Sequence, residues 1–304
     1  MKINRGILYG IGAYTLWGLL PIYWKALQQT PALEILANRM VWSLVFVVTL
    51  LLIWRHWSWL RPALRDRRIL VTYLGTASLL AINWFTYIWA VNAGFIIETS
   101  LGYFINPLLN VLLGLLFLQE RLRVGQALAL CLALLGVIYL TIVYGSFPWI
   151  ALVLALTFGF YGLLRKTGSL KSAEGLTLET AFYFIPAVAY LLFVNASGSG
   201  SFANGDPRTT ILLVGTGIVT GVPLILFGAA AKRITMTNLG LLQYIAPTLQ
   251  FLLGVFVYQE EFSQARLIGF AIIWSALIVY SIESLRHSRG KVSSQTLIET
   301  AVSD

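Results

Sequence analysis

Four ionisable residues, Lys25, Glu34, Arg39 and Glu98, lie in or beside apolar stretches long enough to cross a bilayer. An unpaired charge at the bilayer centre costs ~2.5 to 3.5 kcal/mol on insertion scales, so we expect these two positive and two negative side chains to neutralise one another. Two interpretations stay open. The four residues form a structural ion-pair cluster, or Glu98 or Glu34 exchanges a proton while Lys25 or Arg39 contacts an anionic group of a substrate.

Amide and aromatic side chains recur at helical spacing in the same apolar stretches. Lipid stabilises such groups poorly, so they should face the interior of a helix bundle or a wet cavity. Facing amides and aromatic rings suit an amphipathic small organic molecule, although they also join helices to one another. The residues that we expect to line a substrate cavity are Tyr14, Trp17, Asn83, Tyr87, Tyr103, Asn106, Asn110, Gln243 and Gln250.

A proline-centred segment occurs twice, at 101–120 and at 241–260, and nine of the twenty aligned pairs are identical. Pro107 and Pro247 lie near the middle of the two copies. Since proline has no amide hydrogen, each one leaves the carbonyl four residues earlier without its helical partner. Such a carbonyl is satisfied by packing in a tolerated kink, or it belongs to a binding site where the two copies meet. The matched pair favours the second interpretation.

Several catalytic motifs are absent from the sequence. It has no GxxxxGK[ST] phosphate loop, no HExxH zinc motif and no GxSxG nucleophile elbow, and its single cysteine, Cys131, lies in an apolar stretch. ATP hydrolysis through a phosphate loop is thereby excluded, and an intramembrane metalloprotease is not supported. We expect no metal, no cofactor and no enzymatic activity. A membrane enzyme that acts on lipid is the less favoured alternative.

The composition is typical of a membrane protein. Apolar residues make up 58% of the 304 residues and charged residues only 11%, with a mean hydropathy of +0.81. Soluble domains have about 25% charged residues. The net charge of +9 could indicate nucleic-acid binding, but Lys and Arg collect on the cytoplasmic loops of membrane proteins for reasons of orientation. We therefore expect a lipid bilayer, and no nucleic acid, as a partner.

Hydropathy predicts an all-α polytopic fold with ten transmembrane helices. They are expected at 6–27, 33–54, 69–91, 96–118, 123–143, 147–165, 176–194, 209–231, 236–258 and 264–285. With the N-terminus inside, 17 of the 21 basic residues fall on the cytoplasmic side. Both termini should therefore be cytoplasmic.

The repeat divides these helices into two halves of five, residues 1–143 and 147–285, followed by a polar cytoplasmic tail, 286–304. Because five is an odd number, the second half must enter the membrane in the opposite sense, so the repeat is inverted. The connection between the halves is short, and we expect the halves to pack as one bundle.

Six motifs of the chain resemble one family. They are AYTLWGLLPIYWK at 13–25, EILANRMVWS at 34–43, NWFTYIWAVN at 83–92, TSLGYFINPLLN at 99–110, FYGLLRK at 160–166 and QYIAPTL at 243–249. These motifs are similar to the RarD subgroup of EamA-type permeases, in the drug/metabolite transporter superfamily, over about residues 6–285. The resemblance implies a bacterial inner-membrane carrier with ten helices in two inverted repeats. Members of the family are read as exporters of amino acids, metabolites or drugs.

The repeat, the cavity residues and the resemblance together predict a secondary transporter, or permease. It should move a small organic metabolite, amino acid or drug by alternating access, as an exporter, through a cavity lined by the first, third and fourth predicted helices and their repeat partners. A channel-like facilitator would share the duplication but would need a continuous polar pore. Protons as the coupling ion and assembly as a homodimer are further expectations.

Overall fold

In the computed structural model, the described residues are 4–93, 95–145, 147–201, 207–259, 264, 267–269 and 271–283, without the side chains of 88, 91, 92, 96–98, 100 and 144. The side chain of Glu98 and the predicted tail, 286–304, lie outside the described residues. The helices are α1 (Arg5–Ala26), α2 (Ala32–Ile53), α3 (Leu60–Arg65), α4 (Arg67–Asn92), α5 (Ile96–Leu118), α6 (Val124–Tyr144), α7 (Trp149–Thr167), α8 (Ser172–Ala196), α10 (Pro207–Ala231), α11 (Met236–Gln243), α12 (Ile245–Leu252) and the π-helix η1 (Leu253–Val257).

The predicted all-α membrane fold is confirmed. Among the described residues, nine helices are long and apolar enough to cross a membrane, if α11, α12 and η1 count as one. A shorter apolar helix, Leu267–Glu283, lies where the tenth was expected. Large apolar side chains such as Ile185 and Phe193 are exposed on the outer surface of α8, as lipid-facing positions require. Helix α3, in the arginine-rich connection between α2 and α4, was not predicted.

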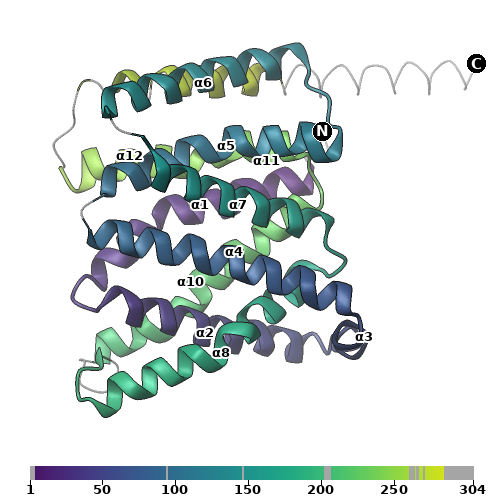
Figure 1. Ribbon diagram of the computed structural model, residues 1–304, viewed down its shortest axis with the longest axis vertical. Helices are drawn as coiled ribbons and strands as arrows, with labels where there is room; N and C mark the ends of the chain where they lie inside the picture. Colours follow the sequence, from purple (N-terminus) through teal and green to yellow (C-terminus); the bar gives the residue numbers. More distant parts are fainter. Residues whose placement is uncertain are drawn as a thin grey trace, which may run out of the picture.

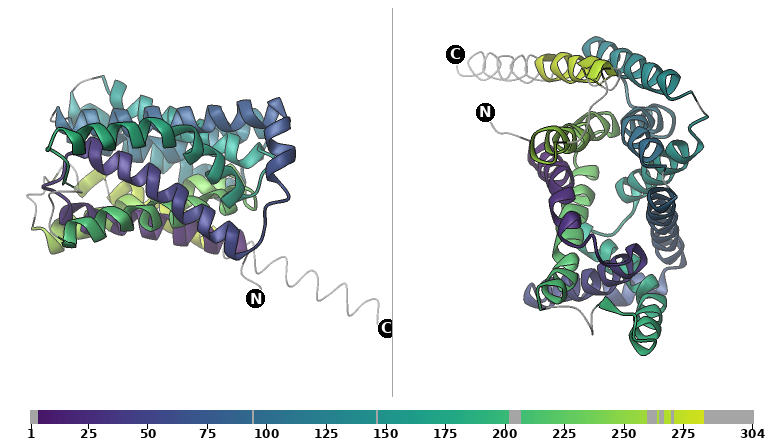
Figure 2. Two further views of the ribbon diagram at one scale, coloured as in Figure 1. Left: turned by 90° about the horizontal axis from the view of Figure 1, so that it is seen from below. Right: turned by 90° about the vertical axis from the view of Figure 1, so that its left-hand side faces the viewer.

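The helices run side by side across the molecule, with their ends at two opposite faces (Figures 1 and 2). At one end of Figure 1, α6 packs against Leu267–Glu283. Gly136 makes close approach possible there, because a β-carbon on it would lie 2.8 Å from the Ile273 side chain. In the rest of the molecule, α5 packs on α7, and α10 packs on α1 and α2. These helices form the body that holds the site.

The two proline-centred segments differ in structure. Helix α5 continues through Pro107 without a break. The second segment, expected as one helix over 236–258, is divided at Tyr244, where α11 ends and α12 begins. Pro247 thereby falls in the first turn of α12, where a missing amide costs little because those amides have no intrahelical partner. The chain then continues into η1.

The end of the first segment anchors the start of the second. Helix α5 ends at Gln119, whose φ of 51° is left-handed. The next residue, Glu120, accepts hydrogen bonds from the backbone amides of Met236 (2.6 Å) and Thr237 (3.0 Å) and from the Thr237 hydroxyl (2.9 Å). A carboxylate at a helix N-terminus satisfies free amides and complements the helix dipole. Glu120 therefore fixes the beginning of α11 against the end of α5.

Candidate substrate cavity

A partly open cavity of about 190 Å³ lies in the middle of the body. It is bounded by the C-terminal half of α1, the N-terminal halves of α5 and α7, and parts of α2, α4, α10, α11 and α12. The six spans expected to line a cavity therefore all contribute, and α2 adds Arg39. Eight of the nine residues expected at a cavity line this one: Tyr14, Trp17, Asn83, Tyr87, Tyr103, Asn106, Gln243 and Gln250. Their role in substrate binding stays a prediction.

The ninth residue, Asn110, lies behind the cavity wall. It is fully buried, and its amide nitrogen donates to Asn106 Oδ1 (3.2 Å) and to Gln243 Oε1 (2.9 Å). Asn110 thus joins α5 to α11 and positions two residues that do line the cavity. Among the prolines, Pro247 is on the wall, whereas Pro107 is not among the described lining residues.

Two other polar residues of the wall hold helices together. The amide of Asn83 donates to the Leu154 carbonyl and to the Thr157 hydroxyl, both at 2.9 Å, which ties α4 to α7. The amide of Gln250 donates to the Trp17 carbonyl at 3.2 Å, which ties α12 to α1. These side chains therefore serve packing as well as lining the cavity.

Arg39 is the only charged residue among the described residues that line the cavity. Its Nε donates to the Thr220 hydroxyl at 3.0 Å. Its guanidinium carbon lies 4.4 Å from the ring centre of Trp84 and 4.9 Å from that of Trp24, distances that allow cation–π attraction. None of the ion pairs formed by the described residues includes Arg39.

The described ion pairs join none of Lys25, Glu34 and Arg39 to one another, and the charge cluster of four residues stays a prediction. Lys25 Nζ lies 3.7 Å from the ring centre of Tyr258. The carboxylate of Glu34 accepts from the backbone amide (2.7 Å) and hydroxyl (2.9 Å) of Ser201. The helices turn these side chains toward different neighbours, so each charge finds a separate polar or aromatic contact. Glu98, the fourth member, lies outside the described side chains.

Phe227 and four aromatic rings around it form a layer at the cavity wall, and three of these rings, Tyr14, Trp17 and Phe158, line the cavity. The Phe227 ring centre is 5.3 Å from Phe158, 5.6 Å from Trp17, 5.8 Å from Tyr161 and 6.2 Å from Tyr14. Tyr14, Tyr161 and Phe227 are fully buried. Such contacts add packing energy beyond area burial, and the layer separates the cavity from the inner part of the bundle.

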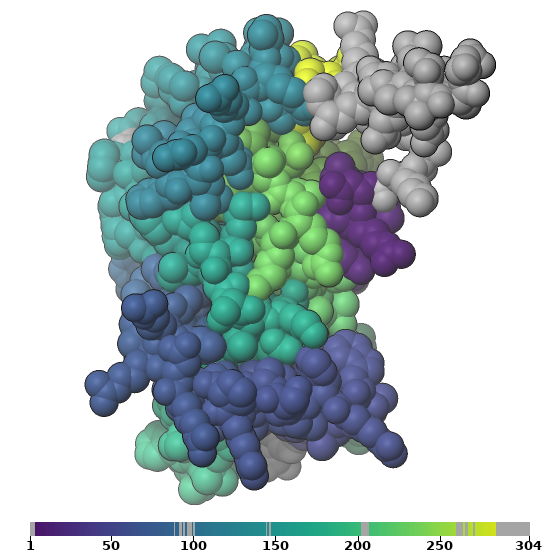
Figure 3. Space-filling model, turned by 90° about the vertical axis from the view of Figure 1, so that its right-hand side faces the viewer, coloured from purple at the N-terminus to yellow at the C-terminus, as the bar shows by residue number. Residues whose placement is uncertain are grey.

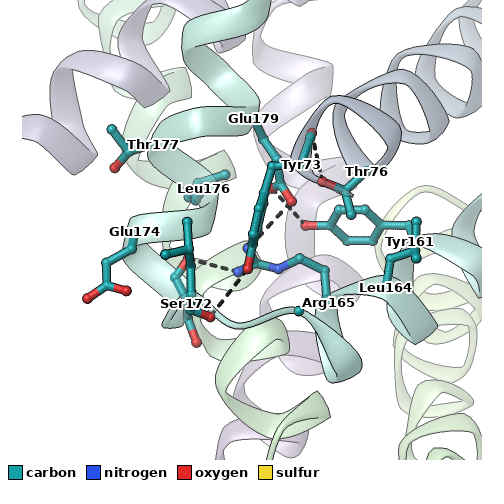
Figure 4. A network of polar contacts seen from close by, with 12 residues as sticks. Tyr73, Thr76, Tyr161, Leu164, Arg165, Ser172, Glu174, Leu176, Thr177 and Glu179 are labelled. Atoms are coloured by element: carbon teal, nitrogen blue, oxygen red, sulfur yellow. Dashed lines mark hydrogen bonds and ion pairs between the residues drawn. The ribbon is translucent and has the colours of Figure 1, made fainter. Parts of the chain in front are cut away.

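A buried polar network adjoins this layer at Tyr161 (Figure 4). Arg165 Nη1 pairs with Glu179 Oε1 at 3.4 Å, and Arg165 Nη2 donates to the Ser172 carbonyl at 2.8 Å. The Tyr161 hydroxyl donates to Glu179 Oε2 at 3.3 Å. Both charged side chains are almost fully buried, and the ring of Tyr73 lies beside Arg165. We call Tyr73, Tyr161, Arg165, Ser172 and Glu179 the inner network.

Lysines hold the loops around the inner network together. Lys166, at the end of α7, donates to the carbonyls of Ala231 (3.1 Å) and Ile234 after α10. In the opposite direction, Lys232, directly after α10, donates to the carbonyls of Gly168 (2.7 Å) and Leu170 after α7. Burial, and then the nearby charge of Arg165, lowers the pKa of Lys232. Figure 3 views this face, and the teal and light-green segments meet across its middle.

Comparison with known proteins identifies the family. Residues 4–142 match the model of the EamA-like transporter family. The chain is 46% identical to "Protein RarD" of Streptomyces exfoliatus over 94% of its length and 91% of the relative. It is also 46% identical to "Uncharacterized transporter YojE" of Bacillus subtilis (strain 168), over 96% of this chain and 98% of that one. The chain belongs to the EamA-like transporter family. Its relatives are named as transporters, which points to a membrane transporter and away from an enzyme.

A solved structure shows the same fold as this EamA-like transporter. A crystal structure at 20% sequence identity matches with a TM-score of 0.67 and covers 92% of this chain and 98% of its own. At that identity the likeness concerns the fold alone.

Sequence reasoning missed the inner network of this EamA-like transporter. Arg165 was assigned to the basic residues near the cytoplasm, and Glu179 was not singled out. A signal was present, because Glu179 is an acidic residue inside a predicted span, 176–194, and charges inside spans are rare and paired. The sequence does not show that α7 turns Arg165 toward it.

Proposed function

We propose that this EamA-like transporter is a secondary carrier that moves a small organic solute across the bacterial inner membrane by alternating access, in the direction of export. One observation carries the proposal. The cavity is partly open, and two successive barriers, the aromatic layer and the inner network, lie on one side of it. A carrier needs a closed side of this kind in each of its states.

The orientation expected from basic residues places the inner network toward the cytoplasm. The N-terminus of α1 and the arginine-rich helix α3 lie at the same end of the molecule as the face in Figure 3. With both termini inside, the cavity lies in the outer half, and the structure corresponds to a carrier closed toward the cytoplasm. For an exporter, this is the state from which solute has left.

We also propose that the two halves are inverted repeats. Contacts between the halves recur with the roles of the halves exchanged, at residue spacings of 140 or 141. A β-carbon on Gly18 would lie 2.7 Å from Leu249 Cβ, and a β-carbon on Gly159 would lie 2.8 Å from a methyl carbon of Leu109. The Tyr244 hydroxyl donates to the Phe104 carbonyl at 3.2 Å, and these residues are equivalent to each other. A two-fold axis between α5 and α11 would produce this pattern.

A channel-like facilitator is less well supported. A channel needs a continuous polar path, whereas a packed layer of five aromatic side chains extends from the cavity wall to Tyr161 of the inner network. A membrane enzyme is also less well supported, because the relatives are named as transporters. Coupling to protons and assembly as a homodimer remain predictions from the sequence.

Counterflow in proteoliposomes tests the proposal. A labelled solute would first be selected by a thermal-shift screen of amino acids and amphiphilic drugs on purified protein. Preloading the vesicles with unlabelled solute should accelerate uptake of the label, as only a carrier allows. An equal rate of uptake with and without preloaded solute would indicate a channel.

A paired variant tests the place of the site. Asn110→Leu with Gln250→Leu should abolish counterflow, because it removes the amide that positions Asn106 and Gln243 and an amide of the cavity wall. The exposed amide of Gln29 offers a matched control, since Gln29 does not line the cavity. Intact counterflow in the paired variant would show that the site lies elsewhere.

A further inference from the structure

We propose that the cavity selects solutes that combine a carboxylate with a flat apolar body and carry no positive charge, and that Arg39 binds the carboxylate. The inference rests on the proposed function, because it names the substrate class of the same cavity. It goes beyond a general small organic solute by excluding zwitterions and cations as preferred ligands.

The charged groups among the described residues of the cavity wall are unbalanced. Among its described residues the only charge is the positive one of Arg39, and no Asp or Glu is present. Arg39 is half-buried and joins none of the ion pairs of the described residues. A buried charge without a counter-ion is costly. An anionic solute would supply a counter-ion that no described residue of the wall provides, whereas a cation would add to the imbalance.

The contacts of Arg39 leave donors for a ligand. A guanidinium carries five N–H donors, and one nitrogen, Nε, is used on the Thr220 hydroxyl. The indole rings of Trp24 and Trp84 approach the guanidinium carbon at 4.9 and 4.4 Å, and rings accept a cation on their faces without taking up its donors in ordinary hydrogen bonds. The planar fork that remains matches a carboxylate, which can accept two parallel hydrogen bonds.

Two phenols extend this donor set. Tyr87 and Tyr103 line the same cavity as Arg39. Their rings pack edge to face at 6.2 Å. Neutral phenol hydroxyls can donate to a carboxylate, so the three side chains together form a donor group for an anion on the outer part of the wall.

The rest of the wall fits a flat apolar body. Trp17, Trp84, Phe158 and Pro247 present ring surfaces to the cavity. Its volume is about 190 Å³, and an apolar cavity of about 150 Å³ is large enough to bind benzene. One aromatic ring with a short carboxylate chain therefore fits. Larger solutes would require the cavity to widen.

The test uses purified full-length protein and ligands that share one phenyl ring on a two-carbon chain. They are 3-phenylpropionate, with a carboxylate only, phenylalanine, with a carboxylate and an ammonium group, and phenethylamine, with an ammonium group only. Equilibrium binding of labelled 3-phenylpropionate is measured at neutral pH, with the other two as competitors. We expect phenylalanine to compete about tenfold more weakly than unlabelled 3-phenylpropionate, and phenethylamine more weakly still.

Variants of Arg39 then test whether its guanidinium binds the carboxylate of the ligand. Arg39→Gln should lower the affinity for 3-phenylpropionate at least about tenfold, and Arg39→Lys should restore part of it, because Lys keeps the charge but not the planar fork. Arg208→Gln is the matched control: Arg208 is exposed and does not line the cavity, so its loss should leave the affinity unchanged.

Three results would overturn the inference: no saturable binding of 3-phenylpropionate to the unmodified protein, equal or better competition by phenylalanine or phenethylamine, or full affinity in a folded Arg39→Gln variant. The ranking of the three ligands is measured on the unmodified protein. It can therefore contradict the inference even if Arg39→Gln does not fold. Counterflow is scored separately. Anion-selective binding without counterflow would support the anion site and contradict the proposed carrier function. Counterflow of another solute, with no preference for anions in binding, would support the carrier function and contradict only the role of Arg39.

Discussion

Arg39 and Arg165 both lie inside the helix bundle, but their surroundings differ. Arg165 is fully buried and pairs with Glu179 at 3.4 Å. Arg39 is half-buried, and its contacts are two indole rings and the Thr220 hydroxyl. Arg165 is neutralised by Glu179, whereas no ion pair of the described residues neutralises Arg39. The first arrangement suits a structural closure on the inner side, and the second suits recognition of an anion in the cavity.

The difference teaches how one residue type can serve two purposes in a single bundle. Removing one partner of a buried ion pair leaves an uncompensated charge, which destabilises the fold. Removing Arg39, which joins no ion pair of the described residues, leaves none of their charges uncompensated, and its main expected consequence is loss of an interaction with a ligand. Disrupting the Arg165 pair should therefore reduce stability far more than replacing Arg39.

The largest effect is expected from Glu179→Leu. This change leaves Arg165 buried without its carboxylate, and the free energy of unfolding should fall by about 3 to 5 kcal/mol. Adding Arg165→Met to the same chain should recover most of the loss, since apolar replacement of a whole buried pair is often neutral. Denaturation of the purified protein in detergent, followed by circular dichroism, measures both variants.

The double variant is the control for this prediction. If it is as unstable as Glu179→Leu alone, the ion pair is not the cause, and loss of the Tyr161 hydrogen bond to Glu179 becomes the better explanation. A single variant of unchanged stability would contradict the assignment of Arg165 to a closed structural network.

A smaller effect is expected from Glu120→Gln, which weakens the inner anchor of α11. The carboxylate accepts three hydrogen bonds from Met236 and Thr237, and bonds to a charged group are worth more than neutral ones. We expect a loss of about 1.5 kcal/mol in the same unfolding assay. The matched control is Asp66→Asn, because Asp66 caps α4 through the exposed amide of Arg68 at 2.8 Å and Asn caps as well as Asp. Equal losses in both variants would argue against an inner anchor.

The positions of the spans could be predicted because the bilayer imposes a length and a polarity on every helix. Helix α5, for example, was expected at 96–118 and is found at Ile96–Leu118. The break at Tyr244 could not be predicted in the same way. Pro107 and Pro247 have similar local sequences, so the difference between a continuous and a divided helix depends on tertiary contacts.

The candidate site was predictable where side-chain polarity alone decides which way a residue faces. Amides such as Asn106 and Gln243 avoid lipid, and both line the cavity. Charge pairing was not predictable, because spacing along the chain does not show how neighbouring helices are rotated. Lys25 and Glu34 were expected in one cluster of four charges, yet they contact Tyr258 and Ser201. The pairing of Arg165 with Glu179 was missed for the same reason.

The two prolines offer a further comparison, with an expected effect of about 1 kcal/mol. Pro107 lies in the middle of α5, so Pro107→Ala restores a helical amide and should raise the unfolding free energy. Pro247 lies in the first turn of α12, where Ala gains no hydrogen bond and the unfolded chain becomes more flexible. Pro247→Ala should therefore be neutral or slightly destabilising. Thermal unfolding of both variants measures the two effects. Equal shifts of the unfolding temperature would show that the break at Tyr244 does not change how much the proline contributes to stability.

The smallest effect on stability is expected from Arg39→Gln in protein without ligand. The variant loses cation–π contacts with Trp24 and Trp84 and a hydrogen bond to Thr220, each worth about 0.5 to 1.5 kcal/mol. It also no longer holds a charge away from water, which offsets that loss. We expect the unfolding free energy to change by less than about 1 kcal/mol. With 3-phenylpropionate at about a hundred times its Kd, the unmodified protein should gain about 2.7 kcal/mol and the variant much less. If Arg39→Gln instead unfolds as readily as Glu179→Leu, Arg39 is a structural residue like Arg165, and the contrast between the two arginines disappears.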